Sequence, residues 1–135
     1  MAVIFVAKSA TVTEWASDVG LGKNIYWVGV DEDADTALAA LNKGFCGGSD
    51  WTVVANADAG AVTAEQAIER LSKREKLIDP KLYPRLRGAV GLFRVKAENV
   101  ENHLLVKKAL EGGEVAAVKL KPADFAAYLL TNAQR

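Results

Sequence analysis

Cysteine, histidine and methionine each occur once in this sequence of 135 residues, and proline occurs three times. The lone cysteine, Cys46, excludes an intramolecular disulfide framework and a zinc site built on cysteines. No apolar run approaches the ~18 residues of a membrane-spanning helix, and the first residues lack the basic and apolar regions of a secretory signal. We therefore expect a cytoplasmic protein without membrane contact.

An excess of charge of either sign is also lacking, because 17 basic and 17 acidic residues give a net charge of zero. The two halves nevertheless differ: residues 1–66 carry three lysines and nine acidic residues, whereas residues 67–135 carry fourteen basic and eight acidic residues. Nine of the basic residues lie between Arg70 and Lys96. This stretch is either a solvated basic face or a docking surface for an acidic partner or a second copy. A neutral chain does not favour a nucleic-acid partner.

The sequence does contain a regular alternation of strand and helix patterns. Short apolar segments typical of buried strands occupy residues 3–6, 25–30, 51–55, 89–95 and 115–120. A helical pattern follows each segment, and three of the helix starts carry capping signals at Thr11, Asp33 and Thr63.

Alternation at this spacing predicts an α/β fold with a doubly wound, five-stranded parallel sheet in a three-layer sandwich, because parallel strands need crossovers of a dozen or more residues. The length favours one domain over residues 1–135. The alternative is an α+β, ferredoxin-like fold, which applies if residues 11–21 are not helical.

Several motifs that suggest chemistry are better explained by structure. Cys46 as a nucleophile needs a base, and His103, the single histidine, lies far along the chain. Residues 20–23, Gly-Leu-Gly-Lys, lack the spacing of a phosphate-binding loop, and residues 31–33 are the acidic start of a helix. We therefore expect no catalytic residue, no metal site and no cofactor.

The order of these segments resembles the receiver domain of bacterial response regulators. Four stretches carry the resemblance: residues 25–38, 50–54, 92–97 and 108–122, the last of which ends in Lys121-Pro122. The resemblance implies a flavodoxin-like sheet in the order 2-1-3-4-5 and a role in signal transduction.

The family's phosphorylation site is degenerate in this sequence. Where the family has an acidic pair after the first strand, this chain has Ala7 and Lys8, and the phospho-accepting aspartate falls on Ala55 or Asn56. The hydroxyl residue after the fourth strand falls on Lys96. Alanine cannot accept a phosphoryl group, and without carboxylates a hard cation has no ligands. The resemblance therefore implies a receiver that has lost its chemistry, a pseudo-receiver.

Two functions follow as predictions, and neither is catalytic. The first is a phosphorylation-independent, protein–protein interaction module in signalling, which contacts a protein partner or a second copy through residues 98–134, the surface that receivers use. The alternative is an anion- or nucleotide-responsive binding domain. In a parallel sheet its basic and amide side chains would converge at one edge. The residues of this predicted anion site are Lys8, Asn56, Lys96 and Lys121.

Overall fold

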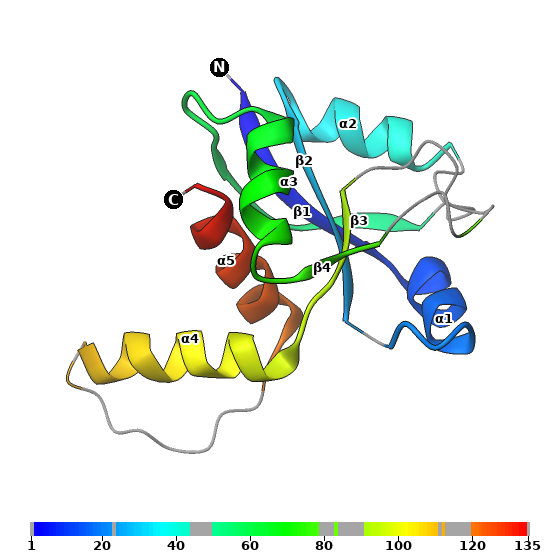
Figure 1. Ribbon diagram of the computed structural model, residues 1–135. Coiled ribbons are helices and arrows are strands. Elements are labelled where there is room, and N and C mark those ends of the chain that lie inside the picture. The colour runs from blue at the N-terminus through cyan, green and yellow to red at the C-terminus, as the bar shows by residue number, and fades with distance from the viewer. Residues whose placement is uncertain are drawn as a thin grey trace.

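The computed structural model describes residues 2–22, 24–43, 50–78, 83, 91–110, 112 and 120–134. Figure 1 shows a twisted sheet with helices on both sides. The elements follow one another in the order β1 (Val3–Ser9), α1 (Ala10–Asp18), β2 (Ile25–Asp31), α2 (Ala34–Leu41), β3 (Trp51–Asp58), α3 (Ala64–Ser72), β4 (Lys76–Leu77), β5 (Leu92–Arg94), α4 (Ala97–Leu110) and α5 (Pro122–Ala133).

The five described strands form one sheet in the order β3-β1-β2-β5-β4, and every pair of neighbours is antiparallel. The predicted parallel, doubly wound sheet is therefore wrong. The α+β alternative is closer, but its condition that residues 11–21 are not helical is not met, because α1 is present. The lengths of the helices supply a physical reason. α1 and α2 have nine and eight residues, a rise of about 13 Å, whereas β1 and β2, with seven residues each, extend about 23 Å. Helices this short do not carry the chain back along a whole strand.

The predicted elements after α3 differ from the observed ones. The strand expected over residues 89–95 is present as the shorter β5, and β4, which pairs with it, was not predicted. Of the strand expected over residues 115–120, only Leu120 belongs to the described residues, and it is not in a strand.

The helix expected near residues 11–21 is present as α1, but Ser9 caps it in place of Thr11. The Ser9 hydroxyl accepts a hydrogen bond from the Val12 N–H at 3.2 Å and itself donates to the carboxylate of Asp50. Asp50 also accepts the Thr11 N–H at 3.1 Å. The hydrogen bond from Ser9, more than the one from Thr11, holds the pKa of Asp50 below its usual value. A residue 41 positions away in sequence thus completes the cap.

Two apolar cores lie on the two faces of the sheet, because alternate residues of a strand point to opposite faces. Ile4 and Val6 of β1 pack with α3, α4 and α5, whereas Phe5 and Ala7 pack with α1 and α2. All four side chains are fully buried, which makes β1 the centre of the fold.

Tyr26 of β2 anchors α5 to the sheet. Its ring stacks on that of Phe125, with centroids 5.3 Å apart. Burial raises the pKa of Tyr26 to about 12, so the phenol is neutral at physiological pH.

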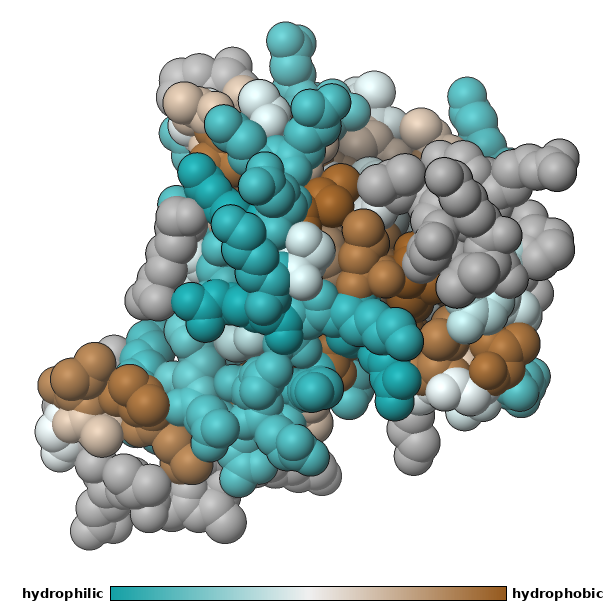
Figure 2. Space-filling view, in the orientation of Figure 1, coloured by the Kyte–Doolittle hydropathy of each residue, from teal (hydrophilic) through white to brown (hydrophobic). Residues whose placement is uncertain are grey.

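α4 extends away from the sheet (Figure 1). Val100 is its one fully buried residue, whereas Val106 and Leu110 near its far end are 58% and 84% exposed. Figure 2 shows hydrophobic residues at that end, separated from the rest of the surface by a hydrophilic area. None of the helices in the described part of the chain is long and apolar enough to cross a membrane.

Candidate functional site: a polar groove between α3, α4 and α5

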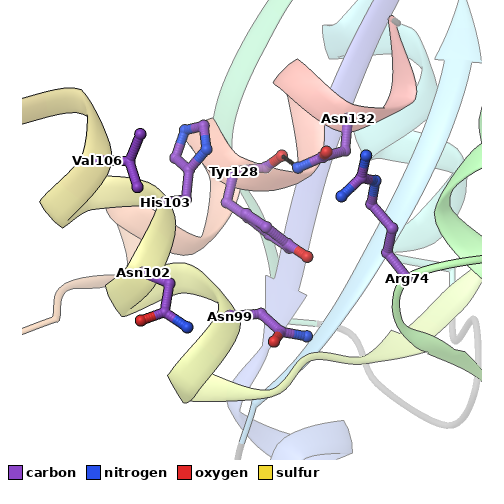
Figure 3. Close-up of a pocket in the computed structure, with 7 residues that line it drawn as sticks. All are labelled: Arg74, Asn99, Asn102, His103, Val106, Tyr128 and Asn132. Atoms are coloured by element: carbon purple, nitrogen blue, oxygen red, sulfur yellow. Dashed lines mark hydrogen bonds between the residues drawn. The ribbon is translucent and has the colours of Figure 1, made fainter. Parts of the chain in front are cut away.

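A polar groove lies where the turn after α3 meets α4 and α5. Its main cavity has a volume of about 450 Å³. Figure 3 shows the side chains that line it, which come from three segments far apart in sequence. They are Arg74, Asn99, Asn102, His103, Val106, Tyr128 and Asn132.

The turn after α3 positions the two charged residues of the site. The backbone N–H groups of Arg74 and Glu75 both donate to the carbonyl of Leu71, at 3.0 and 2.8 Å, so the last turn of α3 ends tightly. Arg74 is exposed on the groove side, whereas Glu75 turns inward and is only 3% exposed.

Glu75 is a buried carboxylate that holds three elements together. One of its oxygens accepts the backbone N–H of Lys96 at 2.6 Å. The other accepts the side-chain amide of Asn99 at 2.6 Å and the hydroxyl of Tyr128 at 2.8 Å. A charge removed from water requires such partners. Glu75 therefore joins the α3–β4 turn to the start of α4 and to the middle of α5.

Tyr128 forms the floor of the groove in its neutral form. Burial raises the pKa of its hydroxyl, and the hydrogen bond to Glu75 and the negative charge of Glu75 raise it further, while the nearby Arg74 acts in the opposite direction. The ring of His103 packs edge-on against Tyr128, with centroids 5.6 Å apart. At physiological pH the hydroxyl therefore keeps its proton, which it donates to Glu75.

Side-chain amides supply most of the hydrogen-bonding groups of the groove. Asn132, which is 5% exposed, donates to the carbonyl of Tyr128 at 2.8 Å. Asn99 and Asn102 come from α4 on the other side of the cavity. Because an amide has two N–H donors and a carbonyl acceptor, one such bond leaves it able to make others.

A second cavity, with a volume of about 390 Å³, continues the groove toward α3. Arg74 and Asn132 line both cavities, and Arg70 and Lys73 complete the second. Arg70 is oriented by a hydrogen bond from its Nη1 to the carbonyl of Ala133 at 3.0 Å. One end of the groove is therefore cationic, and the other end combines amides, aromatic rings and Val106.

The residues of the degenerate phosphorylation site do not share one face of the sheet. In β1, Ala7 packs in the core under α1 and α2. In β3, Ala55 packs with the core under α3 and α5, and Asn56, which pairs with Phe5, belongs to the face covered by α1 and α2. Ala7 and Ala55 thus lie on opposite faces of the sheet.

The three lysines of the predicted anion site lie at the end of β1, before α4 and before α5. Lys8 lines a cavity beside α1, whereas Lys96 lines another that includes Arg94 and Glu98. Lys121 precedes α5, where its backbone N–H donates to Asp124 at 2.9 Å. The expected convergence depended on parallel strands, and the antiparallel sheet removes that basis. Cys46 lies outside the described residues.

The sequence contained one signal for the groove. Glu75 is one of two acidic residues in the basic stretch between Arg70 and Lys96, and an isolated acid among bases is a reason to look for a buried partner. The asparagines and Tyr128 carried no comparable signal, because their spacing is that of ordinary helix residues. Within the described ranges, no three histidine, cysteine or acidic side chains are grouped as metal ligands.

Comparisons with protein families, with curated proteins and with solved structures find no match to this chain.

Proposed function

We propose that this chain is a binding domain that takes an anionic ligand in the groove between α3, α4 and α5. The observation that carries the proposal is the cationic end of the groove, where Arg70, Lys73 and Arg74 line one cavity together with Asn132. Guanidinium groups bind phosphate and carboxylate oxygens in a bidentate geometry. This end offers an anion two such groups, Arg70 and Arg74, and the ammonium group of Lys73.

Two groups at the groove, Glu75 and Tyr128, are poorly suited to act as a general base. A general base must be free to accept a proton from the substrate, whereas both carboxylate oxygens of Glu75 already accept hydrogen bonds from the protein. Tyr128 has a raised pKa, so little of it is ionised at neutral pH. Both residues fix the shape of the groove.

Replacing Arg74 by alanine is expected to weaken anion binding about tenfold or more, since a hydrogen bond to a charged group contributes ~1.5–3 kcal/mol. Inorganic phosphate is the first probe, and the measurement is the increase in melting temperature as its concentration rises. The wild-type protein should be stabilised and Arg74→Ala much less so.

The matched control is Arg94→Ala, which removes an exposed arginine of β5 that lines a different cavity. It should leave the phosphate effect unchanged. An equal loss in both variants, or no stabilisation of the wild-type protein, would contradict anion binding in the groove.

A second candidate function, protein–protein contact through residues 98–134, is favoured by the exposed end of α4. Leu110 is 84% exposed, and Val106 lies one turn before it on the same side of the helix. The partner that fits best is a second copy of the chain in an antiparallel arrangement of two α4 helices. The acidic residues at 98 and 101 lie at the start of α4 and Lys107 and Lys108 lie in its last turn, so an antiparallel pair places opposite charges at the same level along the two helices.

Charge reversal tests this contact. The double variants Glu98→Lys with Glu101→Lys and Lys107→Glu with Lys108→Glu should each lose self-association, because like charges then lie at the same level along the two helices. An equimolar mixture of the two should associate as a heterodimer. Analytical ultracentrifugation measures both states over a range of concentrations. A single helix pair buries less than the roughly 800 Å² per partner of a standard interface, so we expect a weak dimer.

The variant Leu110→Glu tests the apolar part of the α4 contact, and Val19→Glu is its matched control. Val19 directly follows α1 and is also exposed (45%), and Figure 1 shows α1 and α4 on opposite sides of the view. Leu110→Glu should abolish the dimer and Val19→Glu should not. A wild-type protein that stays monomeric at high concentration would refute the contact. The cytoplasmic location and the signalling role implied by the receiver resemblance stay predictions.

A further inference from the structure

We infer that the ligand of the groove is a nucleoside monophosphate, with its phosphate at the end formed by Arg70, Lys73 and Arg74 and its base in the amide-lined cavity. This inference rests on the proposed function and names the ligand class. The inference is based on the difference between the two ends of the groove. A simple anion would occupy the cationic end and leave the amide-lined end empty.

The two cavities are neighbours, and each is of a suitable size for part of such a ligand. They share Arg74 and Asn132, and their volumes of about 450 and 390 Å³ each lie in the range of small-molecule sites. Inorganic phosphate would fill only the cationic cavity. A ligand that uses both must carry an anionic group and a larger, uncharged group linked to it.

The side chains of the larger cavity suit a flat heterocycle. The amides of Asn99, Asn102 and Asn132 combine donors and acceptors, and the edges of nucleobases present both kinds of group. The rings of His103 and Tyr128, together with Val106, give the cavity aromatic and apolar surface for a ring to pack on. Figure 3 shows His103 and Val106 on the side of the cavity opposite Arg74.

The buried charge of Glu75 decides the orientation of the nucleotide in the groove. Its carboxylate lies directly behind Asn99 and Tyr128, both of which donate to it. A phosphate placed at the amide end would be repelled by this charge, whereas at the other end it meets Arg70 and Lys73 as well as Arg74. The uncharged base therefore occupies the amide end.

The test compares ligands on the full chain by isothermal titration calorimetry. The probes are inorganic phosphate, ribose 5-phosphate and the four common nucleoside 5′-monophosphates. At least one nucleotide is expected to bind ten times more tightly than inorganic phosphate and than ribose 5-phosphate. Asn102→Ala, a change at an exposed residue, should weaken nucleotide binding several-fold and leave phosphate binding unchanged, whereas Arg74→Ala should weaken both.

The outcomes separate the two proposals. If phosphate binds in an Arg74-dependent way but no nucleotide binds more tightly, the nucleotide inference is wrong and the anion-binding function stands. Binding of ribose 5-phosphate as tight as that of the nucleotides, or of a short single-stranded oligonucleotide more tightly than a mononucleotide, would also overturn it. If neither phosphate nor any nucleotide binds, both proposals fail.

Discussion

Replacement of Glu75 by leucine is expected to lower the free energy of unfolding by about 3 kcal/mol or more, because each buried polar group left without a partner costs ~1–3 kcal/mol. The leucine would leave the N–H of Lys96, the amide of Asn99 and the hydroxyl of Tyr128 without their acceptor. Urea-induced unfolding, followed by circular dichroism, measures the difference.

Glu75→Gln is the matched control, because glutamine has nearly the same shape and keeps one acceptor oxygen. It should cost clearly less than leucine. The double variant Glu75→Leu with Tyr128→Phe should cost less than the sum of the two single changes, since the phenylalanine removes one of the stranded donors. Equal stabilities of the leucine variant and the wild-type protein would show that the network contributes nothing.

Gly91→Ala is expected to cost about 2–4 kcal/mol, through backbone strain at a positive φ together with a steric clash. Gly91 has a φ of +116°, and a Cβ built on it would lie 2.8 Å from the carbonyl oxygen of Val28. The same two residues are joined by a hydrogen bond of 2.9 Å from the Val28 N–H to the Gly91 carbonyl. The added methyl group and the hydrogen bond both involve the backbone of Val28. The backbone cannot move away from the methyl group without loosening the junction of β2 and β5.

Gly60→Ala provides the comparison. Gly60 also has a positive φ, +57°, but nothing lies within 4 Å of its added Cβ. This variant should cost only about 1 kcal/mol, the strain of a left-handed residue. Chemical denaturation of the two variants side by side separates strain from clash, and equal losses would contradict the close approach at Gly91.

Several local features were correctly predicted from the sequence because they depend on neighbouring residues. Asp33 caps α2, accepting the Asp35 N–H at 3.1 Å, and Thr63 and Gln66 form the predicted capping box of α3. The apolar run at residues 3–6 lies within β1, the most buried strand. At α1, by contrast, the predicted cap at Thr11 is wrong, because Ser9, which contacts Asp50, caps the helix.

The direction of the strands could not be read from the same patterns. Apolar segments alternating with helices are compatible with parallel and antiparallel sheets, since both bury the same side chains. The choice depends on which strands pair, and β1 pairs with both β2 and β3 in the antiparallel sense. This one difference removes the reason to expect Lys8, Asn56, Lys96 and Lys121 at one edge of the sheet.

The sequence by itself determined where the first three strands lie, where α2 and α3 begin, and that the basic residues gather in the second half of the chain. Each of these depends on side chains within a few positions of one another. Only the tertiary structure decided the sheet and the groove. Glu75 binds partners 21, 24 and 53 positions away. Such contacts form because burying a carboxylate requires donors, and packing of α4 and α5 against the end of α3 supplies them.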